Sequence, residues 1–355
     1  MSTNFHLLRI AEVRQESEEA ISLRFEVPPA LAETYRFIQG QHLTLRANIG
    51  GADVRRSYSI CSGIGDGELR IAIKQVANGI FSTYANKELR AGQRIEVLPP
   101  DGRFFVPLAA GNKKHYLAIV AGSGITPLLS IIKTTLAVEP DSRFTLLYGN
   151  QRRGTILFAD TLAALKARCM DRFAVYHFLS REAQELELFN GRLDAARLQR
   201  IFDTLLPLSN ISDAFVCGPN EMIDDAIGAL QQAGLPHAHI HTERFCVPQG
   251  ADTPRTARDD EAAQAPVTVI MDGLAREVGL SAGQSILDAA VSAGIDLPYS
   301  CKGGVCCTCR AKVLAGQVRM DKNFALEPAE VEQGFALTCQ AHPLTENVVV
   351  SFDER

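Results

Sequence analysis

Four cysteines lie within the nine-residue segment CKGGVCCTC, and a later one follows at Cys339. Cys301, Cys306 and Cys309 have the spacing C-x4-C-x2-C, and Cys339 comes 30 positions after Cys309. Four thiolates with this spacing hold a [2Fe-2S] cluster, because one loop supplies three ligands and a later strand supplies the fourth. The sequence therefore predicts a cluster on Cys301, Cys306, Cys309 and Cys339, with Cys307 as a non-ligand.

The residues around these cysteines favour iron and sulfide over the main alternative, a structural zinc site of four thiolates. Gly303 and Gly304 let the loop backbone approach the cluster and direct its N–H groups at the sulfurs. Zinc sites favour paired C-x2-C knuckles, and only one such knuckle, Cys306 with Cys309, exists in this segment. A complete disulfide framework is excluded because the chain has 9 cysteines, an odd number.

The segment RRSYS predicts a flavin site. Arg56, Tyr58 and Ser59 form R-x-Y-S, in which a strand presents a cation for a phosphate, a ring to stack on a flavin and a hydroxyl near the flavin N5. In ANGIFSTY, Gly79 and Ser82 form G-x-x-S at the start of an expected helix, where backbone N–H groups can hold a pyrophosphate. Each signal alone also occurs in a plain barrel, but together they favour FAD.

A second nucleotide site is predicted where apolar strands end. In AGSGITP, Gly122 and Gly124 allow a dinucleotide to approach the start of a helix, and Pro127 fits its first turn. A tight strand-to-helix turn is the alternative, since the full G-x-G-x-x-G pattern is missing. The segment FVCGPNEM ends a later strand at the carboxyl edge, where such sheets bind ligands, with Cys217, Gly218 and Pro219. A buried structural thiol is the alternative role for Cys217.

The choice of electron donor depends on the segment FLSRE. Ser180 and Arg181 come at the end of another expected strand, where they could grip the 2'-phosphate of NADPH. An exposed Arg at this position could equally be an ordinary surface residue. We therefore expect NADPH as the donor, with NADH as the alternative.

The pattern of elements predicts a multi-domain protein that positions these sites. SLRFEV, HLTLRANI, RRSYSIC, ELRIAIKQV and RIEVLPP alternate apolar and polar residues and predict an antiparallel β-barrel. HYLAIVAG, RFTLLYG, FAVYHFLS and DAFVCGP alternate with helical stretches and predict an α/β domain with a parallel sheet. VTVIMDG, REVGL and SILDAAVSAG predict a hairpin and a helix before the cysteine loop. We expect domains at 1–108, 109–246 and 267–355, joined by a Pro- and Ala-rich linker at 247–266.

Charge and hydropathy limit the class of partner. Charges interrupt the apolar runs of the N-terminal segment, so we expect no signal peptide and no membrane partner. The protein is expected to be cytoplasmic, where thiols stay reduced and clustered cysteines bind metal. A net charge of -5 argues against nucleic acid. Residues 267–355 carry 11 acidic and 7 basic side chains, against 30 and 29 in the rest of the chain. This acidic surface could dock to a basic patch on a partner protein; a surface that is only solvated is the alternative.

These motifs in combination resemble known families. Residues 1–245 resemble the ferredoxin-NADP reductase superfamily, whose members share R-x-Y-S, G-x-x-S, the Gly-rich turn with Thr-Pro and the C-G motif. Residues 267–355 resemble plant-type ferredoxins, which implies an α+β (β-grasp) fold. With YRFIQGQHLTL, LLYGN and HTERF, the order of the modules is similar to the reductase subunits of phenylacetyl-CoA 1,2-epoxidase (ring epoxidase) complexes.

The superfamily resemblance implies roles for further residues. Thr126 would lie beside both flavin and nicotinamide, and Cys217 near the nicotinamide C4. Glu243 and Phe245 match an E-x-aromatic element at the flavin face. FAD would be held by Arg56, Ser57, Tyr58, Ser59, Ile73, Lys74, Gly79, Phe81, Ser82, Thr126 and Phe245. The dinucleotide would be held by Gly122, Gly124, Pro127, Ser180, Arg181, Gly218 and Pro219. Catalysis would depend on Ser59, Cys217 and Glu243.

The resemblance implies an electron path from NADPH to FAD, to the [2Fe-2S] cluster and to the di-iron oxygenase subunits of a multicomponent epoxidase complex. The reaction served would be ring 1,2-epoxidation of phenylacetyl-CoA in aerobic phenylacetate degradation. A reductase for a ring- or steroid-hydroxylating oxygenase, or for a hybrid-cluster protein, has similar modules. A zinc-stapled flavin-binding redox sensor is the non-enzymatic alternative.

Overall fold

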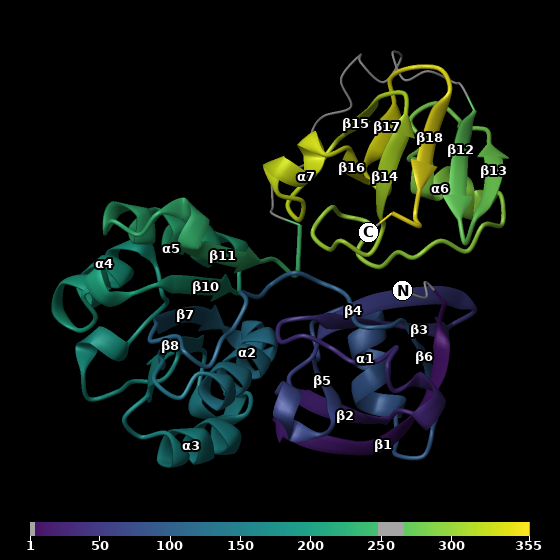
Figure 1. Ribbon diagram of the computed structural model, residues 1–355. Coiled ribbons are helices and arrows are strands. Elements are labelled where there is room, and N and C mark those ends of the chain that lie inside the picture. The colour runs from purple at the N-terminus through teal and green to yellow at the C-terminus, as the bar shows by residue number, and fades with distance from the viewer. Residues whose placement is uncertain (1–3, 248–265, 355) are drawn as a thin grey trace. The chain divides into compact units, whose positions relative to one another are not determined.

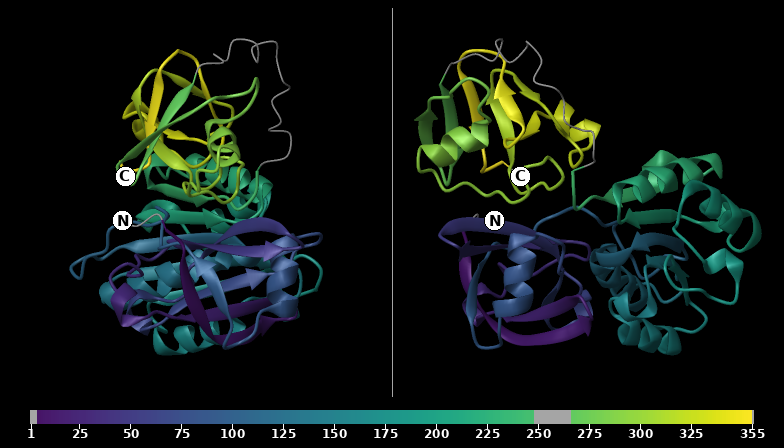
Figure 2. Two further views of the ribbon diagram at one scale, coloured as in Figure 1. Left: turned by 90° about the vertical axis from the view of Figure 1, so that its right-hand side faces the viewer. Right: turned by 180° about the vertical axis from the view of Figure 1, so that it is seen from behind.

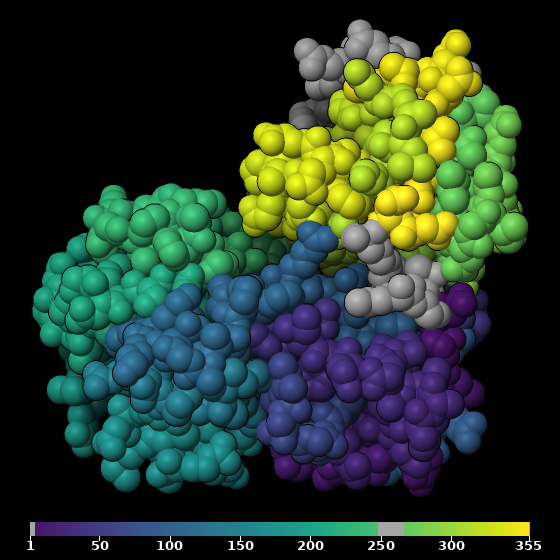
Figure 3. Space-filling model, viewed as in Figure 1, coloured from purple at the N-terminus to yellow at the C-terminus, as the bar shows by residue number. Residues whose placement is uncertain are grey.

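A computed structural model of the chain describes residues 4–247 and 266–354. The chain forms two compact units, residues 1–243 and 244–355. Figures 1 and 2 show the ribbon, and Figure 3 shows the surface. Most of the predicted linker, residues 248–265, lies outside the described residues. Among the residues described, no helix is long and apolar enough to cross a membrane.

The first part of unit 1–243 is a six-stranded antiparallel barrel with strand order β4-β3-β6-β1-β2-β5. An isolated bridge between Ile60 and Ile71 connects the two ends of the sheet. Leu43 and Phe81 belong to its apolar core, so helix α1 packs against the strands through its buried face. The elements are β1 (His6–Ser17), β2 (Ala20–Glu26), β3 (His42–Ile49), β4 (Ala52–Ser59), β5 (Leu69–Lys74), α1 (Ile80–Glu88) and β6 (Arg94–Val97).

The second part of this unit is a five-stranded parallel sheet with strand order β11-β10-β7-β8-β9. One apolar cluster lies on the face covered by α2 and α3, and another lies on the face covered by α4 and α5 (Figure 1). The strands are β7 (His115–Ala121), β8 (Arg143–Asn150), β9 (Phe173–Leu179), β10 (Asp213–Cys217) and β11 (Ile240–Glu243). The helices are α2 (Ile125–Val138), α3 (Ala159–Arg168), α4 (Ala195–Thr204) and α5 (Asn220–Gln232).

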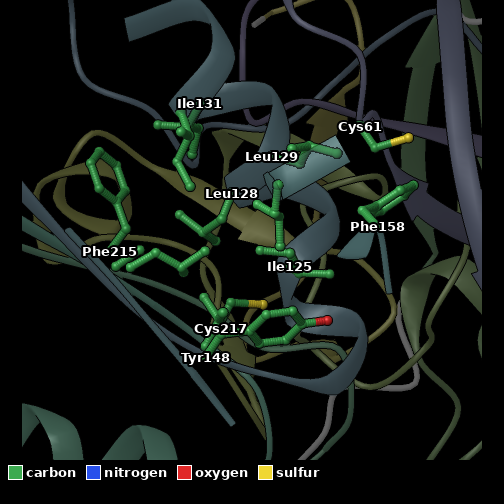
Figure 4. Close-up of a cluster of buried hydrophobic side chains, with 14 of the residues drawn as sticks. Cys61, Ile125, Leu128, Leu129, Ile131, Tyr148, Phe158, Phe215 and Cys217 are labelled. Carbon is green, nitrogen blue, oxygen red and sulfur yellow. The ribbon is translucent and has the colours of Figure 1, made fainter. Parts of the chain in front are cut away.

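The barrel and the parallel sheet share one apolar cluster. Ala20, Cys61 and Ala72 of the barrel belong to the same buried cluster as Ile125 and Leu129 of α2 (Figure 4). Burial of apolar surface is the main favourable term in folding, so this shared cluster fixes the barrel against the sheet. The two predicted nucleotide sites therefore belong to one compact unit.

Unit 244–355 contains a mixed sheet with strand order β13-β12-β18-β14-β16, in which β12 and β18 are parallel. Strands β15 and β17 form a separate two-stranded sheet. The strands are β12 (Val267–Met271), β13 (Leu274–Val278), β14 (Arg310–Ala315), β15 (Val318–Met320), β16 (Phe335–Leu337), β17 (Ala341–Pro343) and β18 (Val348–Ser351). The helices are α6 (Ile286–Ser292) and α7 (Pro328–Glu332).

The predicted fold class is confirmed in all three parts, but the sequence patterns missed the first strand. β1 pairs with β2 through two register shifts, between Ile10 and Glu12 and between Gln15 and Ser17. A register irregularity interrupts the alternation of inward and outward side chains on which strand prediction depends. The longest strand of the barrel therefore gave no clear pattern.

Candidate functional site

The flavin-binding motif lies at the end of β4, where side chains alternate between two faces. Ser57 places its Oγ 2.9 Å from Thr44 Oγ1, which ties β4 to β3. Arg56 is exposed and Tyr58 is only partly buried, with its ring 5.7 Å from the ring of Phe81. A cation and an aromatic face therefore remain available on the same strand, as an FAD phosphate and ring require.

The G-x-x-S motif spans the N-cap, Gly79, and the first turn of α1. Ser82 Oγ accepts a hydrogen bond from Val76 N at 3.3 Å and donates one to Gly79 O at 3.2 Å. A Cβ at Gly79 would lie 2.3 Å from that Oγ, so only glycine fits. The Ser82 hydroxyl thus shapes the turn, and the N–H groups of the first helical turn are left for a phosphate.

Two further predicted FAD residues have their side chains engaged in the barrel. Ile73 is fully buried in the barrel core, so a contact with FAD would come from its backbone. Lys74 pairs with Glu19, with Nζ 3.1 Å from Oε2.

The two glycine-containing turns of the parallel sheet pack against each other. A Cβ at Gly124 would lie 2.2 Å from the carbonyl oxygen of Cys217, so a side chain there would push the turn after β7 away from the end of β10. Gly218 is less confined, since a Cβ there would lie 2.6 Å from Met222 Cε, the mobile end of a side chain, and 3.2 Å from Ala121 N. Gly122 has a φ of 55°, a left-handed conformation that favours glycine.

Hydrogen bonds hold the Gly-rich turn in place. Thr126 Oγ1 donates to Ser123 O at 3.0 Å, and Tyr148 Oη donates to Gly122 O at 3.0 Å. Pro127 is buried in the first turn of α2. Sequence reasoning did not assign Tyr148 to the site; its only signal was a Tyr two residues before the end of an apolar strand. Figure 4 shows Tyr148 and Cys217 in the buried cluster that contains Ile125 at the start of α2.

The three predicted catalytic residues come together although they are distant in the sequence. Ser59 Oγ donates to Glu243 Oε2 at 3.3 Å, across 184 positions. Cys217 and Glu243 are register partners on the parallel strands β10 and β11. Burial, reinforced by Glu243, raises the pKa of the Cys217 thiol, so this thiol stays protonated. A hydroxyl, a thiol and a carboxyl group thus lie where the barrel meets the carboxyl edge of the sheet.

Glu243 is enclosed at its carboxyl end although part of its side chain is exposed. Burial raises its pKa from the ordinary 4.5 to about 8, and the hydrogen bond from Ser59 opposes this shift. The carboxyl group is therefore protonated at neutral pH and can donate a hydrogen bond as well as accept one.

This raised pKa predicts a pH-dependent stability. In the unfolded chain Glu243 ionises near pH 4.5, whereas in the folded protein it keeps its proton to about pH 8. The folded state therefore binds more protons in this window, and the free energy of unfolding falls as the pH rises through it. We expect the Tm of the wild type to fall by a few degrees relative to Glu243→Gln between pH 5 and 8, measured by thermal unfolding. Glu221→Gln, at an exposed helix position, should follow the wild type.

The predicted 2'-phosphate residues lie at the carboxyl end of β9. Ser180 and Arg181 are both exposed, and their backbone N–H groups bond Asn150 O at 3.0 Å and Gln151 O at 2.9 Å. Glu182 next to them pairs with Arg153 at 3.3 Å. Within the described residues the Arg181 guanidinium has no ion pair, so it can meet a phosphate.

In unit 244–355, four cysteines lie around one loop. Cys301 and Cys306 place their Sγ atoms 3.1 Å apart, and Gly303 N donates to Cys301 Sγ at 3.4 Å. The hydrogen bond from Cys306, with backbone N–H groups of the loop, lowers the pKa of Cys301 to about 5. Cys309 and Cys339 are buried, and each perturbs the pKa of the other's thiol. Four cysteine sulfurs around one loop, with backbone N–H groups lowering the pKa of Cys301 and of Cys339, fit a [2Fe-2S] cluster.

Cys307 and Phe245 are the two residues of this unit whose predicted roles the structure leaves open. Cys307 directs its Sγ to Ala325 O at 3.4 Å and packs against the apolar core of the unit. Its exclusion from the ligand set stays a prediction. Phe245 is 40% exposed and belongs to the second unit, so its role at the flavin also stays a prediction.

Comparisons with known families match each part of the chain. The model of the oxidoreductase FAD-binding domain matches residues 7–106, and that of the oxidoreductase NAD-binding domain matches residues 118–227. The model of the 2Fe-2S iron-sulfur cluster binding domain matches residues 269–344. The fold and these matches define an electron-transfer flavoprotein reductase fused to a [2Fe-2S] ferredoxin domain.

Curated proteins and solved structures place the chain more closely. It is 46% identical over 354 residues to a subunit of the 1,2-phenylacetyl-CoA epoxidase of Escherichia coli, covering 99% of each chain. It is 35% identical to the ferredoxin reductase component of 3-ketosteroid-9-alpha-monooxygenase of Mycolicibacterium smegmatis, covering 98% of this chain and 97% of the relative. The structure of phthalate dioxygenase reductase covers 98% of each chain with a TM-score of 0.59 at 22% identity, which shows the shared fold. The chain therefore belongs to the family of oxygenase reductase components that includes the first two proteins.

The residues present fit the chemistry of this family. When bound, FAD accepts a hydride from the nicotinamide, and a [2Fe-2S] cluster carries single electrons onward. The protein's own residues would bind and orient these groups, and the structure brings Ser59, the buried Cys217 and the carboxyl group of Glu243 together at one place.

Proposed function

We propose that this protein delivers electrons from NADPH to the di-iron oxygenase subunits that epoxidise the ring of phenylacetyl-CoA. The observation that carries the proposal is the 46% identity, over nearly the whole of both chains, to the epoxidase component of Escherichia coli. The arrangement of Ser59 with Glu243, and the thiolate set of the second unit, support electron transfer along this route.

The proposed acceptor is tested by reconstitution. The purified reductase is mixed with the oxygenase subunits of a phenylacetyl-CoA epoxidase, and NADPH oxidation is followed with and without phenylacetyl-CoA. We expect oxidation coupled to formation of the epoxide. Oxidation that stays uncoupled with this oxygenase, but becomes coupled with a steroid-hydroxylating oxygenase, would favour the second candidate.

That second candidate is a reductase for a steroid-hydroxylating oxygenase. It has the support of 35% identity to the 3-ketosteroid-9-alpha-monooxygenase component over 98% of this chain. The lower identity makes it the alternative.

We further propose that Arg181, with Ser180, selects NADPH over NADH by binding the 2'-phosphate. The exposed guanidinium at the end of β9 supports this role. Because a charge-assisted hydrogen bond contributes about 1.5–3 kcal/mol, Arg181→Ala should raise the KM for NADPH about 10- to 100-fold. Steady-state kinetics with NADH should be nearly unchanged, since NADH lacks this phosphate. Arg200→Ala, which removes an exposed partner of Glu187, is the control. An equal loss with both donors would contradict the assignment.

We propose the following set of roles for the remaining site residues. The flavin side is formed by Arg56, Ser57, Tyr58, Ser59, Ile73, Lys74, Gly79, Phe81, Ser82 and Phe245. The nicotinamide side is formed by Gly122, Gly124, Pro127, Cys217, Gly218 and Pro219. Thr126 lies beside both rings, and Glu243 belongs with Phe245 to the flavin side. Cys301, Cys306, Cys309 and Cys339 are the proposed ligands of the cluster.

A further inference from the structure

We propose that Gln340 is a positioning residue for the cluster, whose side-chain amide raises the reduction potential and holds the ligand loop in place. This inference rests on the proposed ligand set, in which Cys339 is a thiolate ligand. It adds a side chain outside the C-x4-C-x2-C motif to the residues that control electron transfer.

The amide of Gln340 is placed between the fourth ligand and the loop that carries the first. Its Nε2 lies 2.9 Å from Lys302 O, 3.0 Å from Cys339 O and 3.8 Å from Cys339 Sγ. An amide nitrogen has two hydrogens, so these three acceptors share them. This one side chain thus connects the turn at Cys339, between β16 and β17, with the loop after Cys301.

The loop that Gln340 holds is conformationally strained. Lys302 has a φ of 52°, which is unfavourable for a residue with a side chain. Its ammonium is bonded to Asp288 Oδ1 at 2.8 Å, and its carbonyl is bonded to Gln340. Asp288 in turn accepts from Ser285 Oγ at 2.9 Å at the start of α6. Lys302 is therefore held at both its side chain and its backbone, which offsets the strain.

The contact with sulfur has an electronic consequence. Reduction adds negative charge to the cluster and its thiolates, so an N–H group directed at a ligand sulfur stabilises the reduced state more than the oxidised state. Backbone donors such as Gly303 N are present in any loop of this shape. The donor from Gln340 depends on the side chain and can be removed by substitution.

The test is the Gln340→Leu variant of the full-length holoprotein, with its midpoint potential measured by spectroelectrochemical titration. Leucine keeps the size of the side chain but removes the donor. Because the hydrogen bond is long and shared, we expect about a threefold shift of the electron equilibrium toward the oxidised cluster. At 59 mV per tenfold change this is a fall of about 28 mV. Gln333→Leu, at an exposed position of the same unit, should keep the wild-type potential.

A second readout separates positioning of the loop from tuning of the potential. Loss of the bond to Lys302 O should make iron loss to a chelator several-fold faster in Gln340→Leu than in Gln333→Leu. An unchanged potential in Gln340→Leu would overturn the tuning role, and an unchanged rate of iron loss would overturn the positioning role. If Gln340→Leu does not retain the cluster, Gln340→Glu replaces it, and a potential at or above the wild-type value would overturn the tuning role.

A separate variant, Cys339→Ser, distinguishes failure of the inference about Gln340 from failure of the proposed ligand set. If Cys339→Ser keeps a normal cluster spectrum, the ligand set is wrong, whatever the behaviour of Gln340. If Cys339→Ser loses the cluster while Gln340→Leu matches the wild type in both readouts, only the inference about Gln340 fails.

Discussion

Replacing Cys339 by Ser should remove the cluster while leaving the flavin in place. The wild type should contain roughly two irons and two acid-labile sulfides per chain, and the variant much less, because a serine hydroxyl ionises far less readily than a thiol and is a weaker iron ligand. Cys339 is buried in the apolar core of its unit, together with Cys309. Reduction of FAD by NADPH should continue, while single-electron reduction of cytochrome c should nearly stop.

Cys307→Ser is the matched control for this variant. Its Sγ donates a hydrogen bond to Ala325 O at 3.4 Å, and Cys307 lies outside the proposed ligand set, so iron, sulfide and visible absorbance should be retained. Loss of the cluster in Cys307→Ser would show that the predicted ligand set is wrong. Zinc in place of iron in the wild type would instead favour the four-thiolate structural site.

Substituting Gly124 by Ala should cause the second large effect, on hydride transfer. The added Cβ would lie 2.2 Å from Cys217 O, so the turn after β7 and the end of β10 must move apart. Overpacking of this kind costs about 1–3 kcal/mol of stability. A displacement on the order of 1 Å can lower a rate about 100-fold, so we expect a loss of this size in flavin reduction by NADPH, measured by anaerobic stopped flow.

The control for this effect is Gly228→Ala in α5, where an added Cβ meets nothing within 4 Å. Alanine is the better helix former, so this variant should be as stable as the wild type or more so, with unchanged kinetics. FAD content and the cluster spectrum should be normal in both variants. A wild-type rate of flavin reduction in Gly124→Ala would contradict the proposed placement of the nicotinamide at this turn.

Local patterns in the sequence determined most of the fold. The β3 segment HLTLRANI was predicted with its observed bounds, His42–Ile49, because its side chains alternate and turn residues flank it. The helix after Gly79 and the hairpin after residue 267 were also predicted, because their signals lie within a few neighbouring residues. β1 was missed because its register shifts break the alternation.

Some features of the candidate site were likewise predictable from local sequence patterns, and others were not. The spacing of Cys301, Cys306 and Cys309 is a property of one loop, so the sequence alone indicated the class of cofactor, which the matching 2Fe-2S family model supports, and predicted a thiolate ligand set. It also determined the R-x-Y-S and G-x-x-S motifs, since each belongs to a single strand or turn. The resemblance to known reductases supplied the role of Glu243, which no local pattern indicates.

Only the tertiary structure decided how distant residues act on one another. The hydrogen bond from Ser59 to Glu243 joins the barrel to the last strand of the parallel sheet, and the enclosure there raises the pKa of the carboxyl group. The closeness of Gly124 to Cys217 and the reach of Gln340 to Lys302 likewise depend on how strands are paired. Burial and hydrogen bonding arise from packing between segments, and residue spacing along the chain carries no direct record of either.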